Sequence, residues 1–106
     1  MNLRYAAAAL VALAIPASAS AATECLPAKV QRIWIGDGGL VWIFLDSSRP
    51  VPVISYNDPN REAALAAAMT AQSTGRSITV RFTADNVSCT TAVARYDFAG
   101  LYLESF

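Results

Sequence analysis

The segment AQSTGRSITVRF, residues 71–82, passes from a helix to a strand within a few residues. Most residues at 61–74 are strong helix formers, and Gly75 stands where a helix-ending residue with positive φ is expected. Apolar and polar residues alternate in the part that follows, which is typical of a strand with one buried face. The apolar set of that strand comprises Ile78, Val80 and Phe82. The segment therefore predicts a helix followed by a half-buried strand.

Strand patterns surround this helix on both sides. β-branched and aromatic residues, bounded by turn-forming residues, predict strands at 28–36, 40–46, 51–56, 77–83 and 93–106. The sequence GDGG at 36–39 predicts a tight turn that joins the first two strands as a hairpin. Pro52 places the third strand at an edge or a bulge, and Gly100 predicts a bulge or bend in the last strand.

The helix is expected to begin near Asp58 as the N-cap, with Pro59 in the first helical position. Leu65 and Met69 lie four residues apart and share one helix face, so we expect them to be buried against the sheet. The predicted order is therefore β-β-β-α-β-β. This is the order of an OB-fold, a mainly β, five-stranded barrel with its helix between strands 3 and 4.

Residues 1–21 have the pattern of a secretory signal peptide. Arg4 precedes the apolar run YAAAALVALAIP at 5–16, and two overlapping small-residue cleavage sites follow. The run is too short to span a bilayer and stops at Pro16, which disfavours the alternative of a membrane anchor. We therefore expect a single domain at 22–106, exported to the periplasm or the extracellular space, without stable membrane insertion.

Cys25 and Cys89 are the two cysteines of the chain. In an oxidising compartment they are expected to form a disulfide, which a small domain needs for stability. An OB-fold supports this pairing, because its first strand lies antiparallel to its fourth and brings the two flanking segments together. A lipid anchor on Cys25 is disfavoured by Glu24, which stands where a small residue is expected. Two thiols without a histidine do not make a metal site, so no metal or cofactor is expected.

Charge and residue types exclude some classes of function. Without the predicted signal peptide, seven Lys and Arg residues face eight Asp and Glu residues, which gives a net charge of −1. The chain therefore lacks the basic patch that is typical of nucleic-acid binding. It also has no histidine, the commonest acid–base residue, and no nucleophile–base motif. We expect neither a nucleic-acid-binding protein nor an enzyme.

The sequence ALAAAMTAQSTGRSITVRF, residues 64–82, resembles the helix-to-strand passage of the B subunits of bacterial pentameric A–B toxins, that of subtilase-type cytotoxin in particular. The shared features are a helix ending in Ser-Thr-Gly, a basic or polar residue, and an alternating strand. The passage also resembles that of many small exported bacterial proteins with one disulfide. The toxin resemblance implies a secreted OB-fold that assembles into a ring and binds cell-surface glycans. It carries over no glycan-binding residue, because no site motif matches outside this passage.

Residues 40–45 are apolar at every position, so both faces of this strand are apolar. One face carries Leu40, Trp42 and Phe44, and the other carries Val41, Ile43 and Leu45. A barrel interior takes only one set, and the second must meet the helix, another layer or a partner chain. We therefore expect self-association; the alternative is that the last strand and the N-terminal segment cover this face within one chain.

Trp34, Trp42 and Tyr56 are the candidate ligand or subunit contacts. Their flat faces suit stacking on a sugar, but packing in a core or subunit contact is the commoner role of such side chains. Two functions stay open. The first is a secreted binding module that recognises a glycan or a protein surface. The second is an exported structural or interaction protein of the envelope without a small-molecule site.

Overall fold

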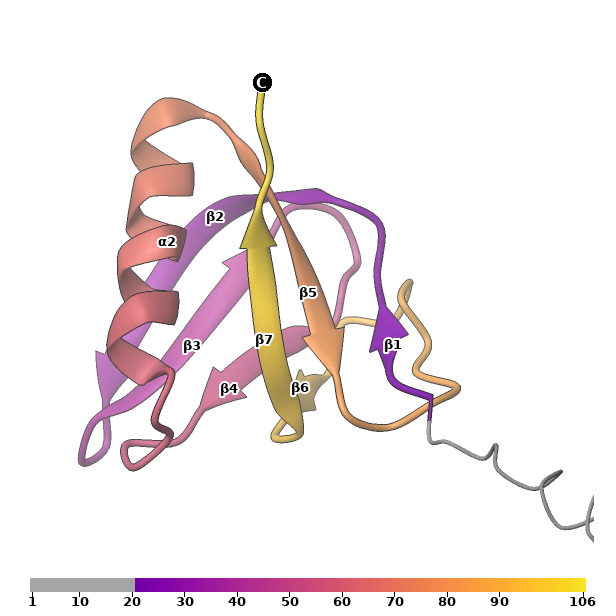
Figure 1. Ribbon diagram of the computed structural model, residues 1–106, viewed down its shortest axis with the longest axis horizontal. Coiled ribbons are helices and arrows are strands. Elements are labelled where there is room, and N and C mark those ends of the chain that lie inside the picture. Colours follow the sequence, from indigo (N-terminus) through magenta and orange to yellow (C-terminus); the bar gives the residue numbers. More distant parts are fainter. Residues whose placement is uncertain (1–20) are drawn as a thin grey trace, which may run out of the picture.

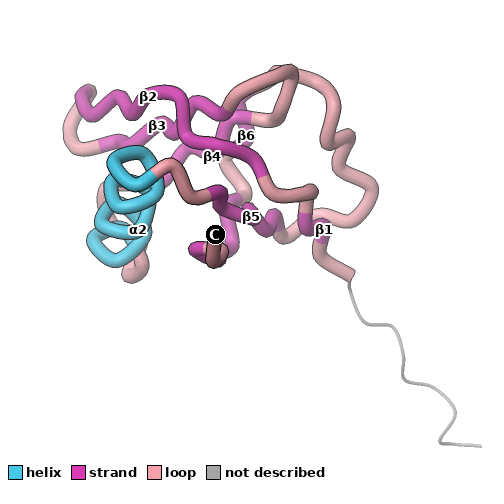
Figure 2. Tube along the Cα trace, turned by 90° about the horizontal axis from the view of Figure 1, so that it is seen from above, coloured by secondary structure: helices cyan, strands magenta, loops and turns pink. Residues whose placement is uncertain are grey.

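The computed structural model describes residues 21–106, so the predicted signal peptide lies outside the described residues apart from Ala21 (Figure 1). The elements are β1 (Thr23–Glu24), β2 (Ala28–Gly36), β3 (Leu40–Leu45), β4 (Val51–Ile54), α2 (Arg61–Thr74), β5 (Ser77–Phe82), β6 (Ala94–Arg95) and β7 (Phe98–Leu103). The strands form a mixed sheet that curls into a half-barrel, and α2 lies against one side of it (Figures 1 and 2). The prediction of a small, mainly β domain with a helix after its third long strand is confirmed.

The sheet order is β1-β5-β2-β3-β4-β6, and β7 pairs with the other edge of β5. All pairs are antiparallel except β4 with β6, which run parallel. The first predicted strand pairs with the fourth, as expected, because Ala28 lies opposite Ile78. Pro52 does not lie at a sheet edge, since the chain returns after β5 and places β6 beside β4, with Arg95 opposite Pro52.

The long final strand predicted at 93–106 is wrong, because the chain changes partner within it. Its first part, β6, pairs with β4, and its second part, β7, pairs with β5. Between them the Asp97 carboxylate accepts hydrogen bonds from Arg95 and from the backbone N–H of Ala84, which holds the chain in a bend. The register then shifts at Ala99, next to Gly100, so the predicted irregularity near that glycine is confirmed.

The helix α2 begins later than predicted, at Arg61 with Asn60 in the N-cap position. The Asp58 side chain caps the preceding turn instead, since its Oδ1 accepts a hydrogen bond of 2.8 Å from the backbone N–H of Asn60. Pro59 therefore lies in that turn and not in the helix. The predicted end is confirmed, because Gly75 has a φ of 77° and its N–H donates to the carbonyl of Ala71.

The face of α2 that meets the sheet consists of alanines, and Ala64, Ala68 and Ala71 are its buried residues. Leu65 is only partly buried at the margin of the core, and Met69 is 54% exposed. The prediction that Leu65 and Met69 form the buried face is therefore wrong for Met69 and only partly right for Leu65. Short alanine side chains let the helix approach the sheet closely, whereas longer side chains on this face would hold it away.

The core lies between the concave face of the sheet and the alanine face of α2. Alternation in the strands selects its members as predicted, and the most deeply buried large side chains include Val41, Ile43, Ile54, Ile78 and Phe82. In β3 the inner face is therefore the one that carries Val41 and Ile43. The opposite face, with Trp42 and Phe44, points away from this core and is partly exposed.

Candidate functional site: an aromatic surface on the first hairpin

The outer face of the β2–β3 hairpin collects aromatic side chains by its register. Trp34 lies directly opposite Trp42, and Arg32 lies opposite Phe44. Directly opposed residues on one face of an antiparallel pair are close enough for their side chains to touch. Tyr96, in the bend between β6 and β7, joins them from a distant part of the chain. We call Trp34, Trp42, Phe44 and Tyr96 the aromatic surface.

Trp42 is the centre of the aromatic surface. Its ring meets Trp34 edge to face with 6.3 Å between centroids, and it meets Tyr96 in the same way at 6.4 Å. Phe44 stacks on it at 6.1 Å. Edge-to-face and offset-stacked pairs at these distances are favourable beyond the area that they bury. The rings therefore hold one another in place without covering from another layer.

The turn of the hairpin positions the Trp34 indole. An added Cβ on Gly36 would lie 2.6 Å from Cζ2 of Trp34, so the ring occupies space that only a glycine leaves free. Asp37 and Gly38 follow with φ values of 45° and 79°, which produce the predicted tight turn. The GDGG sequence thus turns the chain and also seats the tryptophan.

A hollow of about 270 Å³ lies on this surface, lined by Trp34, Asp37, Trp42 and Phe44. Asp37 is the one acidic residue in this lining. The Arg32 guanidinium lies over the Phe44 ring at 4.7 Å from the centroid and supplies donors beside the hollow. Apolar walls with a few charged groups at the rim are typical of small-ligand sites.

The indole N–H of Trp42 is buried and has no hydrogen-bond acceptor among residues 21–106. Leaving a buried donor unpaired costs about 1–3 kcal/mol. Packing against three other aromatic rings holds the Trp42 side chain in this position despite that cost.

The structure brings together two of the three predicted site residues, Trp34 and Trp42. Tyr56 follows β4, is exposed, and contacts the other side of the turn near Gly39 instead of lining the hollow. Sequence reasoning missed Phe44 and Asp37 as members, although the alternation of β3 already places Phe44 on the face of Trp42. It had no means to find Tyr96, because only the bend before β7 brings that residue to the hairpin.

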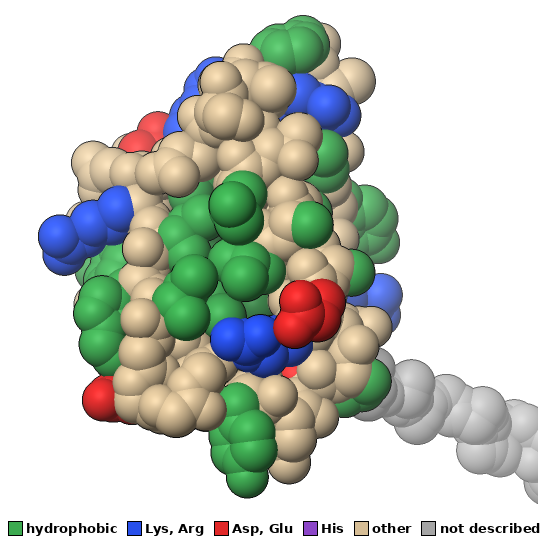
Figure 3. Space-filling model, turned by 90° about the vertical axis from the view of Figure 1, so that its left-hand side faces the viewer, with side chains coloured by type: hydrophobic (Ala, Val, Ile, Leu, Met, Phe, Trp, Pro, Cys, Tyr) green, Lys and Arg blue, Asp and Glu red, His purple; other side chains and the backbone are tan. Residues whose placement is uncertain are grey.

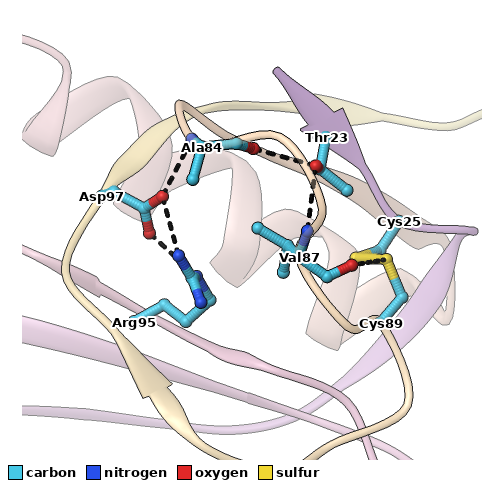
Figure 4. A network of polar contacts seen from close by, with 7 residues as sticks. All are labelled: Thr23, Cys25, Ala84, Val87, Cys89, Arg95 and Asp97. Carbon is cyan, nitrogen blue, oxygen red and sulfur yellow. Dashed lines mark hydrogen bonds and ion pairs between the residues drawn. A yellow bond between two sulfur atoms is a disulfide. The ribbon is translucent and has the colours of Figure 1, made fainter. Parts of the chain in front are cut away.

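The other end of the molecule holds the predicted disulfide between Cys25 and Cys89, whose Cα atoms are 5.4 Å apart (Figure 4). The link joins the chain before β2 to the loop after β5. Thr23 reinforces it, because its hydroxyl donates to the carbonyl of Ala84 at 2.8 Å and accepts from the N–H of Val87 at 3.3 Å. A disulfide of this kind is typical of domains in an oxidising environment.

Arg95 and Asp97 form a two-pronged ion pair beside this loop, with N–O distances of 2.9 and 3.1 Å (Figure 4). The hydrogen bond from Arg95 lowers the pKa of the Asp97 carboxyl below its usual value, and the Ala84 N–H lowers it further, while partial burial opposes both effects. The pair joins the two sides of the bend before β7. Neither residue lines the hollow on the aromatic surface. Through the Ala84 N–H, Asp97 also ties this bend to the loop that follows β5.

Comparisons with known proteins add no assignment, since no family model, curated protein or solved structure matches this chain. Within residues 21–106, no helix has the length and apolar character needed to cross a membrane.

Proposed function

We propose that this chain is an exported, non-enzymatic binding module that holds a carbohydrate ring at the aromatic surface. The single observation that carries the proposal is the hollow lined by Trp34, Trp42, Phe44 and Asp37, with Trp34 still 42% exposed. Large aromatic side chains that stay accessible on a small domain are a feature of binding surfaces.

The chemistry of the hollow fits a sugar better than a wholly apolar ligand. Indole and phenyl faces suit the C–H face of a sugar ring, while Asp37 accepts hydrogen bonds from hydroxyl groups and Arg32 donates them. The volume of about 270 Å³ is just below the range of about 300–1,000 Å³ for ordinary small-molecule pockets. The site is therefore of a size for one sugar ring at the end of a glycan.

The strand pairings support a finer proposal for the fold, namely an OB-fold barrel. In that fold the last strand pairs first with the third strand and then with the fourth, and the fourth pairs with the first. Here β6 pairs with β4, β7 with β5, and β5 with β2. This assignment agrees with the toxin B-subunit resemblance of residues 64–82, which implies glycan binding. Export to the periplasm or beyond agrees with the disulfide.

A glycan array probed with the oxidised domain, followed by titration of the best glycan monitored by tryptophan fluorescence, tests the proposal. Trp34→Ala is expected to weaken binding about tenfold or more, because it removes one wall of the hollow. Tyr56→Ala is the matched control, an exposed aromatic outside the hollow, and should leave affinity unchanged. Equal losses in both variants, or no glycan bound by the unmodified domain, would reject the proposal.

Self-association is the second candidate role of the aromatic surface, favoured by the apolar outer face of β3. A ring oligomer or an envelope interaction protein would bury Trp42 and Phe44 further against another chain. Tyr96 already covers part of this face within one chain, as the alternative account expects. Light scattering coupled to size-exclusion chromatography separates these cases. A single-subunit mass at micromolar concentration would reject the ring.

A further inference from the structure

A second surface, separate from the aromatic one, lies between the helix and the last strand. A groove of about 300 Å³ has α2 as one wall and β7 as the other, with Ala63, Ala64, Ala67, Phe98, Gly100 and Leu101 among its lining residues. The view from the α2 side shows hydrophobic side chains gathered across the middle of this face (Figure 3). The groove is therefore lined mostly by small and apolar residues, with Asn60 as its polar member.

The β7 wall of the groove is a free sheet edge. Among the described strands β7 pairs with β5 alone. The N–H of Glu104 donates to the carbonyl of Ser77 directly opposite, so hydrogen-bonded pairs alternate from there along the ladder. This alternation directs the backbone groups of Gly100 and Tyr102 to β5. It leaves the N–H and C=O groups of Leu101 and Leu103 pointing away from β5.

These unpaired groups specify the chemistry of the occupant. A row of alternating backbone donors and acceptors is complementary to another extended polypeptide. Sheet edges that are protected against pairing with another chain usually carry a charge, a proline or a bulge. Phe98–Leu103 has no charge and no proline, and its bulge at Ala99 lies near one end, which leaves the rest of the edge regular. The edge itself therefore presents no charge that would attract a charged segment, and an uncharged occupant matches it. The groove volume of about 300 Å³ limits the occupant to small side chains where it faces Ala63 and Ala67 of α2.

We propose that the groove accepts an extended, uncharged segment of a partner protein, which adds to β7 as a further strand. The position of α2 beside the β7 edge favours a single segment as the occupant over a second copy of this chain. In a second copy the β7 edge is itself flanked by α2, so edge-to-edge pairing would drive the two helices into each other's sheets. A single segment has no helix attached to its edge and fits between α2 and β7.

A displayed library of random short peptides, selected against the oxidised domain, tests this proposal. The selected peptides are expected to contain an uncharged core with small residues at alternate positions. Ala63→Trp fills the groove from an exposed helix position and should weaken their binding about tenfold or more. Ala66→Trp is the matched control, since Ala66 is also an exposed helix residue but does not line the groove. Circular dichroism of both variants checks that they fold.

Amide hydrogen exchange distinguishes strand addition from simple apolar contact. In the free protein the amides of Leu101 and Leu103 should exchange faster than those of Gly100 and Tyr102. A bound peptide should slow exchange at Leu101 and Leu103 about tenfold or more. The proposal is overturned if no peptide is selected, if Ala63→Trp has no effect, or if the two amides stay unprotected in the complex. Protection that rises with protein concentration without peptide would overturn it in favour of a second copy.

Discussion

The two ends of the molecule are held in different ways. At the disulfide end, the link between Cys25 and Cys89 spans 64 residues, and Thr23 binds a loop 61 residues further along the chain. At the hairpin end, Trp34 and Trp42 are near neighbours in sequence that meet through the strand register. The disulfide and the Thr23 hydrogen bonds join distant residues and so fix the path of the chain. The pairing of neighbouring strands in the hairpin instead arranges side chains on a surface. The outer face of the hairpin can therefore present aromatic side chains while its inner face, with Val41 and Ile43, packs in the core.

Removal of the disulfide is expected to have the largest effect on stability. The double variant Cys25→Ser with Cys89→Ser leaves no unpaired thiol. It releases a loop of 64 residues, for which loop entropy gives a loss of about 4 kcal/mol in the free energy of unfolding. Urea unfolding of the two proteins measures the difference. A loss below about 1 kcal/mol would mean that the hydrogen bonds of Thr23 and Asp97 hold this end without the covalent link.

The Arg95–Asp97 pair should contribute less, because its side chains are 29% and 24% exposed to water. Asp97→Asn removes the charge and one prong, and we expect a loss of about 1–2 kcal/mol near pH 7. Because the folded pKa of Asp97 is lowered from its ordinary value of 3.8, its contribution is complete above that value and is lost as pH falls through the folded pKa. Urea unfolding at a series of acidic pH values should therefore show that the unfolding free energies of the unmodified protein and Asp97→Asn converge as pH falls. A constant difference down to the lowest pH would contradict this role.

The helix lies between these ends, and substitutions along it are expected to give a graded effect no larger than that of the ion pair. Leu65→Ala removes a partly buried side chain at the core margin and should cost about 1–2 kcal/mol in unfolding free energy. Met69→Ala, one turn further on an exposed site, should change it by less than about 0.5 kcal/mol. Thermal or urea unfolding of the two variants compares them. Equal losses would mean that Leu65 and Met69 are both buried against the sheet, as the sequence predicts, and would contradict a buried face made of alanines.

The smallest effect on stability is expected at the hairpin, from Gly36→Ala. The added Cβ displaces the half-exposed Trp34 ring, with a change of less than about 0.5 kcal/mol in stability. It should nevertheless shift tryptophan fluorescence and weaken glycan binding about as much as Trp34→Ala does, because the hollow loses the same wall. Gly100→Ala is the control, since an added Cβ there meets no atom within 4 Å. Unchanged fluorescence in Gly36→Ala would show that the indole does not depend on that glycine.

Local sequence was sufficient for the parts of the fold that depend on near neighbours. The alternation at 77–82, the GDGG turn and Gly75 each act within a few residues, and the strand, the hairpin and the helix end lie where these patterns place them. The disulfide was also predictable, since the predicted export and a cysteine count of two leave a single pairing. The same local rules place Trp34 and Trp42 opposite each other once the hairpin register is known.

Tertiary structure decided the features for which several local solutions are equally good. Leu65 and the alanines are all good helix formers, and only the close approach of α2 to the sheet selects the alanine face. Residues 93–106 have strand propensity throughout, but the ion pair at Asp97 divides them between β4 and β5. That division also brings Tyr96 to Trp42 and, among the described strands, leaves β7 paired with β5 alone. Propensity depends on near neighbours, whereas the choice of partner depends on which distant surfaces the folded chain brings together.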